Sequence, residues 1–146
     1  MAKSLLISLL LLAQPVWASP IIDCKKTKDE LYQVACVTYY EARGTPKEDQ
    51  LLVARAVVSR ASHGEFPSTI SDVIRQKNAF THRQNRTLPV KDLKSFNTAL
   101  EVAAKALSLP PTNVVFFHDK SISKPSWKNT KLYKSTKHFK FYSLED

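Results

Sequence analysis

The hydrophobic positions in the first half of the chain recur at the spacing of amphipathic helices. Between residues 27 and 42 the apolar and small positions lie three or four residues apart, at Leu31, Val34, Ala35, Thr38 and Ala42. Residues 27–30 read Thr-Lys-Asp-Glu, the form of a capping box that starts a helix. Gly44 suits the left-handed position just after a helix end. The pattern therefore predicts a first helix from Thr27 to Ala42.

Three more helices are predicted before residue 110. Residues 45–48 repeat the capping-box form, with Pro46 at the first helical position. They open a helix through Arg60 that has little polar surface and is expected to be central. A short third helix is expected over residues 71–76. Asp92 is the expected cap of a fourth, whose apolar face comprises Leu93, Phe96, Leu100, Ala103, Ala104 and Leu107.

The pattern changes after Pro110 and Pro111, which end the helical part. Residues 114–118 form an apolar run typical of a strand, and residues 137–142 alternate between polar and apolar positions. The two segments are predicted to pair across the loop between them. The sequence therefore predicts an α+β fold, in which one mainly helical domain carries a small antiparallel β-hairpin near the C-terminus.

The N-terminus has the features of a secretory signal peptide. Lys3 precedes a short apolar run, and Val16 and Ala18 place small residues at the cleavage positions. An uncleaved anchor is the alternative, but the apolar run is well short of the roughly 20 residues that span a bilayer. We expect residues 1–18 to be removed, which leaves one domain over residues 19–146 that is periplasmic, secreted or held at the cell wall.

If the chain is exported, its two cysteines are expected to form a disulfide. Cys24 precedes the first predicted helix and Cys36 lies inside it. An even number of cysteines in an exported chain favours a disulfide, with two free thiols as the alternative. The bridge would hold the N-terminal arm on the helix and stabilise the fold by about 3 kcal/mol.

The formal net charge is +9, and the excess of positive charge lies near the C-terminus. A run of lysines there contains no Asp or Glu: Lys120, Lys124, Lys128, Lys131, Lys134, Lys137 and Lys140. Such a surface suits an anionic partner. Export favours an anionic cell-wall polymer or membrane surface, and nucleic acid is not expected. A solvated face without any partner is the alternative.

Glu41 is the strongest candidate for chemistry. It lies three residues after Thr38 and seven after Val34, on the inward face of the first predicted helix. Burial and the negative end of the helix dipole both favour the neutral acid, which a general acid requires. A solvated glutamate at a fraying helix end is the alternative, and periodicity alone leaves both open.

Other kinds of chemistry have weaker signals. The chain has no His-Glu-x-x-His, paired Cys-x-x-Cys or Gly-x-Ser-x-Gly motif. His118 and His138 could meet across the hairpin, but only scattered acids such as Asp119 could complete a zinc site. No metal and no cofactor are therefore expected. Several aromatic residues could line a groove and stack on sugar rings, although each could instead belong to the core: Tyr39, Tyr40, Phe80, Phe117, Trp127 and Tyr142.

Several segments, in this order, resemble the spore cortex-lytic, cell-wall hydrolase family. They are Tyr-Tyr-Glu-Ala-Arg-Gly at 39–44, Glu-Asp-Gln at 48–50, Phe-Pro-Ser-Thr-Ile-Ser-Asp-Val-Ile at 66–74, Asn-Ala-Phe-Thr at 78–81, Ser-Trp at 126–127 and His-Phe at 138–139. The resemblance extends over about residues 32–142. Thr45 departs from the family's usual acidic residue, Thr136 and Lys137 replace a common Gly-Asn, and no separate wall-binding domain is present.

The resemblance implies a compact, lysozyme-like, monomeric domain that cleaves the glycan strands of peptidoglycan as a lytic transglycosylase. It aligns the family's catalytic acid with Glu41. It also places some substrate-binding positions in or near the groove, with structural roles as the alternative for each: Tyr40, Gln50, Phe80, Trp127 and His138.

The aspartates bear on the reaction type. Asp49 and Asp72 are interpreted as helix-surface residues or caps, and Asp119 has no assigned place. Since only Glu41 has a persuasive context, a single-acid reaction that gives 1,6-anhydro products is favoured over one with two carboxylates. A lysozyme-type hydrolase with a second Asp and a non-enzymatic basic protein that coats the wall remain the alternatives.

Overall fold

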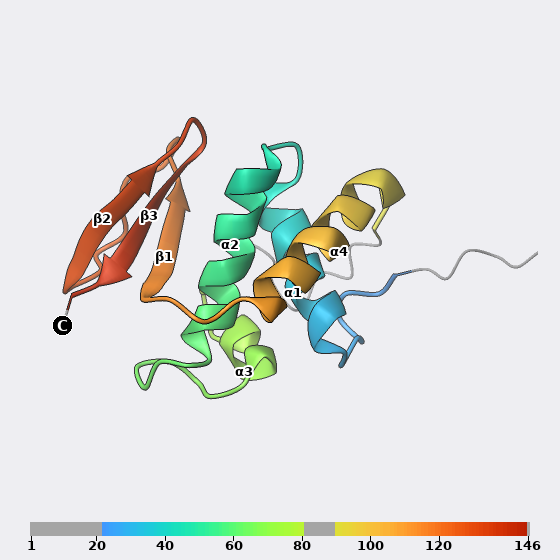
Figure 1. The fold of residues 1–146 in the computed structure, drawn as a ribbon, viewed down its shortest axis with the longest axis horizontal. Helices are drawn as coiled ribbons and strands as arrows, with labels where there is room; N and C mark the ends of the chain where they lie inside the picture. Colours follow the sequence, from blue (N-terminus) through green and yellow to red (C-terminus); the bar gives the residue numbers. More distant parts are fainter. Residues whose placement is uncertain (1–21, 81–89, 146) are drawn as a thin grey trace, which may run out of the picture.

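The computed structural model describes residues 22–80 and 90–145, so the predicted signal peptide lies outside the described residues. Its elements follow in the order α1 (Glu30–Ala42), α2 (Lys47–Arg60), α3 (Ile70–Arg75), α4 (Leu93–Ser108), β1 (Val114–Asp119), β2 (Thr130–Ser135) and β3 (Phe139–Leu144) (Figure 1). The predicted α+β class is confirmed. In the part of the chain that the structure describes, no helix is long and apolar enough to cross a membrane.

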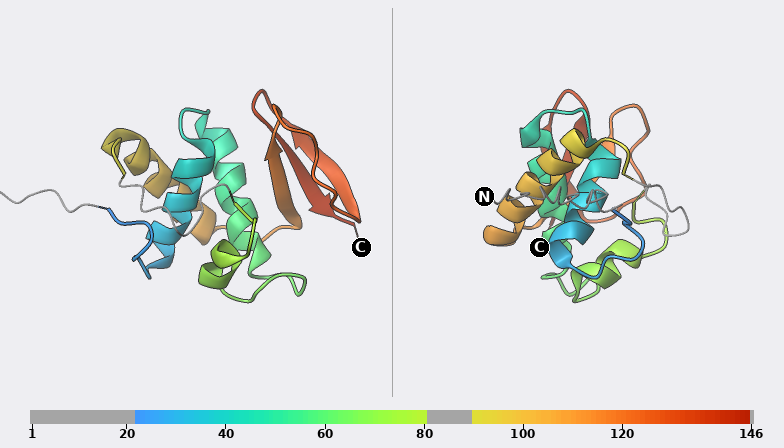
Figure 2. Two further views of the ribbon diagram at one scale, coloured as in Figure 1. Left: turned by 180° about the vertical axis from the view of Figure 1, so that it is seen from behind. Right: turned by 90° about the vertical axis from the view of Figure 1, so that its right-hand side faces the viewer.

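Helix α2 lies between the sheet and the other helices. Figures 1 and 2 show the sheet against one side of α2, with α1 and α4 on the other side and α3 at one end. The apolar clusters follow this arrangement. One joins α1, α2 and α4 around Phe96, a second joins α2 to the sheet around Phe141, and a third joins α1 and α2 to α3 around Val73. The predicted central position of the second helix is confirmed.

The first two helices begin differently from the prediction. Asp29 caps α1, because its carboxylate accepts a hydrogen bond from the Tyr32 N–H at 3.2 Å, and the helix begins at Glu30 rather than at Thr27. Pro46 caps α2 without a side-chain hydrogen bond. Thr45 turns back and donates from Oγ1 to the Ala42 carbonyl at 2.7 Å, so it closes α1 instead of opening α2.

Two predicted helix faces also need correction. Helix α1 is buried on all sides from Gln33 to Tyr39, because α2, α3 and α4 surround it, so it is not amphipathic as predicted. In α4, capped by Asp92 as expected, Leu93 is 47% exposed and Ala104 faces solvent. The buried face of α4 comprises Phe96, Ala99, Val102, Ala103 and Ala106.

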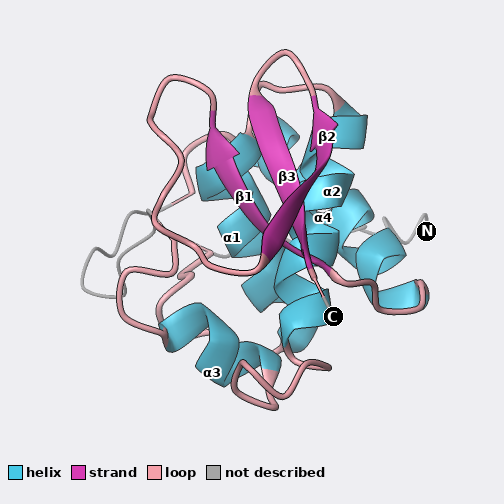
Figure 3. Ribbon diagram, turned by 90° about the vertical axis from the view of Figure 1, so that its left-hand side faces the viewer, coloured by secondary structure: helices cyan, strands magenta, loops and turns pink. Residues whose placement is uncertain are grey.

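The C-terminal sheet has three antiparallel strands in the order β1-β3-β2 (Figure 3). The predicted pairing of β1 with β3 is confirmed, and Phe117 lies opposite Phe141. The prediction of a two-stranded hairpin is wrong, since β2 adds to the other edge of β3. Strand β2 escaped prediction because it has no buried face, and even its Leu132 and Tyr133 are 50% and 58% exposed.

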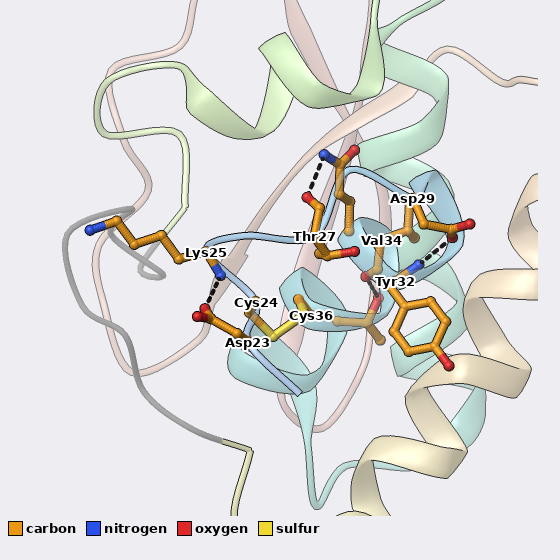
Figure 4. The surroundings of a disulfide bond; sticks show 10 residues. Asp23, Cys24, Lys25, Thr27, Asp29, Tyr32, Val34 and Cys36 are labelled. Atoms are coloured by element: carbon orange, nitrogen blue, oxygen red, sulfur yellow. Dashed lines mark hydrogen bonds between the residues drawn. A yellow bond between two sulfur atoms is a disulfide. The ribbon is translucent and has the colours of Figure 1, made fainter. Parts of the chain in front are cut away.

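The disulfide between Cys24 and Cys36 is present, as predicted, with the two Cα atoms 5.7 Å apart. Figure 4 shows the N-terminal arm drawn across α1 at this bridge. On the same arm, the Gln33 Nε2 donates to the Thr27 carbonyl at 3.2 Å. The bridge and this hydrogen bond therefore fix the arm to the helix that carries Glu41.

Candidate active site

A groove of about 1150 Å³ is lined by the end of α1, the end of α2 and β1. Glu41 and Arg60 come from the two helix ends, and the segment 74–80 that ends and follows α3 forms another wall. The remaining wall is β1 with the loop after it. The groove thus brings together side chains from four parts of the chain.

Glu41 is half-buried and is the penultimate residue of α1. The buried helix before it sets its position, and the helix end after it is well defined. The Arg43 N–H donates to the Tyr39 carbonyl at 3.2 Å, and Gly44 then adopts a φ of 81°, the left-handed conformation expected for it. Glu41 therefore projects from a rigid element into the groove, as its helical position predicted.

The neighbouring tyrosines have different roles. Tyr40 lines the groove beside Glu41, and burial, with a smaller contribution from Tyr39, raises the pKa of its hydroxyl above the usual value. Its hydroxyl therefore stays protonated over a wide pH range. Tyr39 is 1% exposed, and its hydroxyl accepts a 2.6 Å hydrogen bond from Arg43 Nη1. Tyr39 is thus a core residue, not a groove residue.

Aromatic rings from both faces of β1 line the groove. Phe117 points towards the helices and stacks on Phe80, with ring centroids 6.3 Å apart. Phe116 lies on the opposite face, because side chains alternate along a strand, and its ring centroid is 4.8 Å from that of Trp127. The predicted groove residues Phe80, Phe117 and Trp127 therefore do line it.

His118 is buried at the same wall in a defined tautomer. Its Nδ1 lies 2.8 Å from the Asp119 carbonyl, which can only accept, so Nδ1 carries the proton. Its Nε2, 3.1 Å from the Tyr142 hydroxyl, then accepts from that O–H when the ring is neutral. Tyr142 stacks on His118 and packs against Trp127, behind the lining residues, so it supports the wall without forming it.

Two predicted substrate-binding residues lie outside the groove lining. Gln50 is buried, and its Nε2 donates to the Thr45 carbonyl at 2.9 Å, across the turn between α1 and α2. His138 is in the turn between β2 and β3, where its N–H donates to Thr136 Oγ1 at 3.3 Å. Neither residue is among those that line the groove. Their contact with substrate stays a prediction.

The three candidate aspartates are now distinguishable. Asp49 is 4% exposed and accepts a 3.0 Å hydrogen bond from Thr136 Oγ1, so the expectation of a helix-surface residue is wrong. It is buried because the turn between β2 and β3 packs over the start of α2. Asp72 is an exposed residue in the first turn of α3, and its backbone N–H and carboxylate are bonded to Thr69, which caps the helix. Only Asp119 lines the groove with Glu41.

Asp119 is held as a carboxylate. Its pKa is lowered by hydrogen bonds from the Ser121 backbone and side chain, and less by the neighbouring His138 and His118. Within residues 22–80 and 90–145, no three potential metal ligands form a cluster. Whether the protein needs a metal stays a prediction.

Sequence reasoning missed Arg60 as a groove residue. Burial lowers its pKa to about 10, and the negative charge of Glu41 acts in the opposite direction. Its Nε donates to the Val115 carbonyl at 2.7 Å, and its guanidinium lies over the rings of Phe66, Phe80 and Phe116. The one signal in the sequence was a charged residue at the end of a helix with little polar surface.

The sequence profile described as Cell Wall Hydrolase matches residues 44–142, more than half of the chain. The chain belongs to the cell wall hydrolase family. The matched part of the family profile includes Arg60 and the aromatic wall, and it begins three residues after Glu41.

Curated relatives and solved structures agree with this membership. A spore cortex-lytic enzyme of Bacillus cereus is 29% identical over 120 residues, which are 77% of this chain and 44% of the relative. One from Oceanobacillus iheyensis is 38% identical over 55 residues, which are 38% of this chain and 20% of the relative. This member of the cell wall hydrolase family thus spans less than half the length of these relatives.

Two solved structures share its fold. The catalytic domain of the Bacillus cereus SleB protein has a TM-score of 0.62 at 22% identity and covers 79% of this chain and 90% of its own. The catalytic domain of the germination-specific lytic transglycosylase SleB from Bacillus anthracis has the same TM-score and identity, and covers 79% and 94%. The four helices and the small sheet are therefore the architecture of this family's catalytic domain.

Proposed function

We propose that the protein is an exported enzyme that cleaves the glycan strands of peptidoglycan. One observation carries this proposal: Glu41 lies half-buried in an open groove with aromatic walls, at the end of a rigid helix. Membership of the cell wall hydrolase family and the fold shared with the SleB catalytic domains support it. On this proposal the catalytic domain comprises residues 19–146, after removal of the signal peptide 1–18.

The groove has the chemistry that a glycan needs. Sugar rings present apolar faces that stack on aromatic side chains, and their hydroxyl and acetamido groups need hydrogen-bond partners. Phe80, Phe116 and Trp127 provide faces for stacking, and the Tyr40 hydroxyl provides a donor beside Glu41.

We infer a lytic transglycosylase mechanism in which Glu41 acts twice. Glu41 first donates a proton to the oxygen that links N-acetylmuramic acid to N-acetylglucosamine, and that bond breaks. The resulting carboxylate then takes the proton from the muramic C6 hydroxyl, whose oxygen bonds to C1 and closes a 1,6-anhydro ring. Glu41 recovers its proton, and no water is consumed. The intramolecular attack provides the high effective concentration that a second catalytic group would otherwise supply.

A lysozyme-type hydrolase is the second candidate, and the position of Asp119 is the observation that favours it. Hydrolysis requires a second carboxylate on the groove to activate water or bond to the sugar. Asp49 is buried against Thr136 and Asp72 is bonded to the cap residue Thr69 in the first turn of α3, whereas Asp119 is ionised and lines the groove. Asp119→Asn therefore separates the two mechanisms. It would abolish hydrolysis but leave transglycosylation largely unchanged.

The test of the proposed function is Glu41→Gln, which keeps the shape of the side chain and removes the acid. We expect turnover of purified peptidoglycan, measured by release of soluble fragments, to fall at least about 1000-fold with an unchanged thermal melting curve. Glu48→Gln is the matched control, because Glu48 is exposed on α2 away from the groove and its loss should leave turnover unchanged. Near-normal turnover by Glu41→Gln would exclude the proposed mechanism.

The C-terminal lysines suggest how the enzyme stays at its substrate. We propose that the lysine-bearing edge of the sheet binds an anionic polymer of the wall. A non-enzymatic protein that coats the wall would use the same lysines. For such a protein, however, the wild type and the Glu41→Gln variant would adsorb equally well, and neither would release soluble fragments. The enzyme is expected to act as a monomer, without nucleic acid.

A further inference from the structure

Arg60 is a cation in an unusual setting for a groove that receives a carbohydrate. It is only 5% exposed. Its Nε is fixed on the Val115 carbonyl at 2.7 Å, and its guanidinium lies 4.9–5.6 Å from the centroids of the rings of Phe80, Phe66 and Phe116. A buried charge is costly unless other charges or dipoles compensate it. The fold therefore holds a positive charge rigidly at one place in the groove wall.

Glu41 is the charge that acts on Arg60. Both residues line the same groove, Glu41 from the last turn of α1 and Arg60 as the last residue of α2. Desolvation lowers the pKa of Arg60 to about 10, and the negative charge of Glu41 is the influence that raises it. Arg60 consequently remains protonated at neutral pH. Because Coulombic attraction is mutual, the fixed cation also favours the carboxylate form of Glu41.

The other ionisable groups that line the groove differ from Arg60 in exposure or in charge. Tyr40 lies beside Glu41 on α1, Arg75 and Lys77 lie at and after the end of α3, and His118 and Asp119 lie on β1. Arg75, Lys77 and Asp119 are exposed, so solvent screens their charges. Burial raises the pKa of Tyr40, so its hydroxyl carries no charge near neutral pH. Arg60 is thus the buried permanent charge of this wall.

We propose that Arg60 is a positioning residue that stabilises the carboxylate of Glu41 formed on proton donation, and thereby promotes glycosidic cleavage and sets the alkaline limit of activity. This inference rests on the proposed function, in which Glu41 is the general acid. The cation makes Glu41 a stronger acid, and it is fixed before the reaction begins, so no reorganisation accompanies proton transfer. Without this cation, Glu41 would be a weaker acid. Proton donation would then have a higher activation free energy, but Glu41 would stay protonated to a higher pH.

The test is the pH dependence of kcat for the wild type, Arg60→Met and Arg60→Lys. We expect Arg60→Met to move the alkaline limb upward by about one pH unit and to lower kcat at the optimum roughly three- to tenfold. Arg60→Lys keeps the charge and should leave the limb near its wild-type position. Arg55→Met is the matched control on the same helix, since Arg55 also donates to a backbone carbonyl, that of Pro110, but lies outside the groove.

An unchanged alkaline limb in a folded Arg60→Met variant would overturn the proposal, as would an equal shift in Arg60→Lys. Should Arg60→Met fail to fold, the reciprocal measurement decides. NMR titration of the Arg60 guanidinium should show a lower pKa in Glu41→Gln than in the wild type, and equal values would overturn the coupling. This titration needs no activity, so failure of the coupling is distinguishable from failure of Glu41 as the catalytic acid.

Discussion

At the scale of single residues, Trp127 is the groove side chain best placed to test substrate stacking. It comes from the loop after β1 and is half-buried, with its ring centroid 4.8 Å from Phe116 and 5.7 Å from Tyr142. These neighbours restrict the indole before any ligand binds, so stacking would cost little side-chain entropy. A preorganised ring of this kind should contribute to binding more than to chemistry.

We therefore predict that Trp127→Ala raises KM for soluble glycan fragments about tenfold, equivalent to ~1.4 kcal/mol, and changes kcat much less. Steady-state kinetics on fragments of defined length would measure both quantities. Tyr133→Ala is a suitable control, because Tyr133 is an aromatic residue on β2 that is 58% exposed and away from the groove. An unchanged KM in Trp127→Ala would contradict a stacking role.

Residues of the site differed in how far the sequence could place them. Helical periodicity placed Glu41 on the inward face of its helix, but the family resemblance was needed to prefer it over a solvated glutamate. Arg60 could not be assigned in this way, since its surroundings come from other elements: β1, the loop residue Phe66 and Phe80 after α3. Gln50 was assigned by resemblance alone, and its hydrogen bond to Thr45 gives it a structural role in the turn.

At the scale of elements, the arm bridged to α1 determines how firmly the helix that carries Glu41 is held. The disulfide closes a loop with a sequence separation of 12. In the chain-entropy account, a crosslink of this length stabilises the folded state by about 3 kcal/mol, mainly by restricting the unfolded chain. Its effect on the free energy of unfolding should thus exceed its effect on the geometry of the groove.

Cys24→Ser combined with Cys36→Ser should therefore lower the free energy of unfolding by about 3 kcal/mol and leave kcat at low temperature nearly unchanged. Denaturant unfolding of this variant and of the wild type, each with and without reductant, would measure the difference. Reductant should destabilise only the wild type. Equal stability of the two proteins, or a large loss of kcat in the folded variant, would contradict this account.

The sheet illustrates why some elements could be predicted and others could not. Strands β1 and β3 each bury several apolar side chains, and these residues produce the apolar run and the alternation that identified the two strands. Strand β2 is held by backbone pairing to β3 and is exposed along its length. Backbone hydrogen bonds leave no trace in the order of side chains, so this edge strand was read as a loop.

At the scale of the whole molecule, the two edges of the sheet present different surfaces. The β1 edge forms the wall of the groove, while the β2 edge and the turn after it expose Lys131, Lys134 and Lys137. Lysines on an edge strand also discourage pairing with a second chain. This protective role and binding to an anionic polymer predict different results when the lysines are replaced.

We predict that replacing Lys131, Lys134 and Lys137 together by Gln weakens adsorption to isolated cell walls at low salt and leaves cleavage of soluble fragments unchanged. Adsorption by the wild type should fall with added salt, because screening shortens the reach of surface charges. The matched control replaces three exposed lysines on or beside the helices, Lys28, Lys94 and Lys105. Unchanged adsorption together with self-association of the edge variant would instead indicate the protective role.

The central claim is that Glu41 cleaves glycan strands by transglycosylation, and the masses of the products test it most directly. Purified peptidoglycan would be digested with the mature protein, beside the Glu41→Gln variant, and the fragments analysed by mass spectrometry. The account predicts fragments one water lighter than hydrolysed muropeptides, as 1,6-anhydro ends require, and none from the variant. Hydrated reducing ends would contradict it and identify a hydrolase, with Asp119 as the first candidate for the second carboxylate.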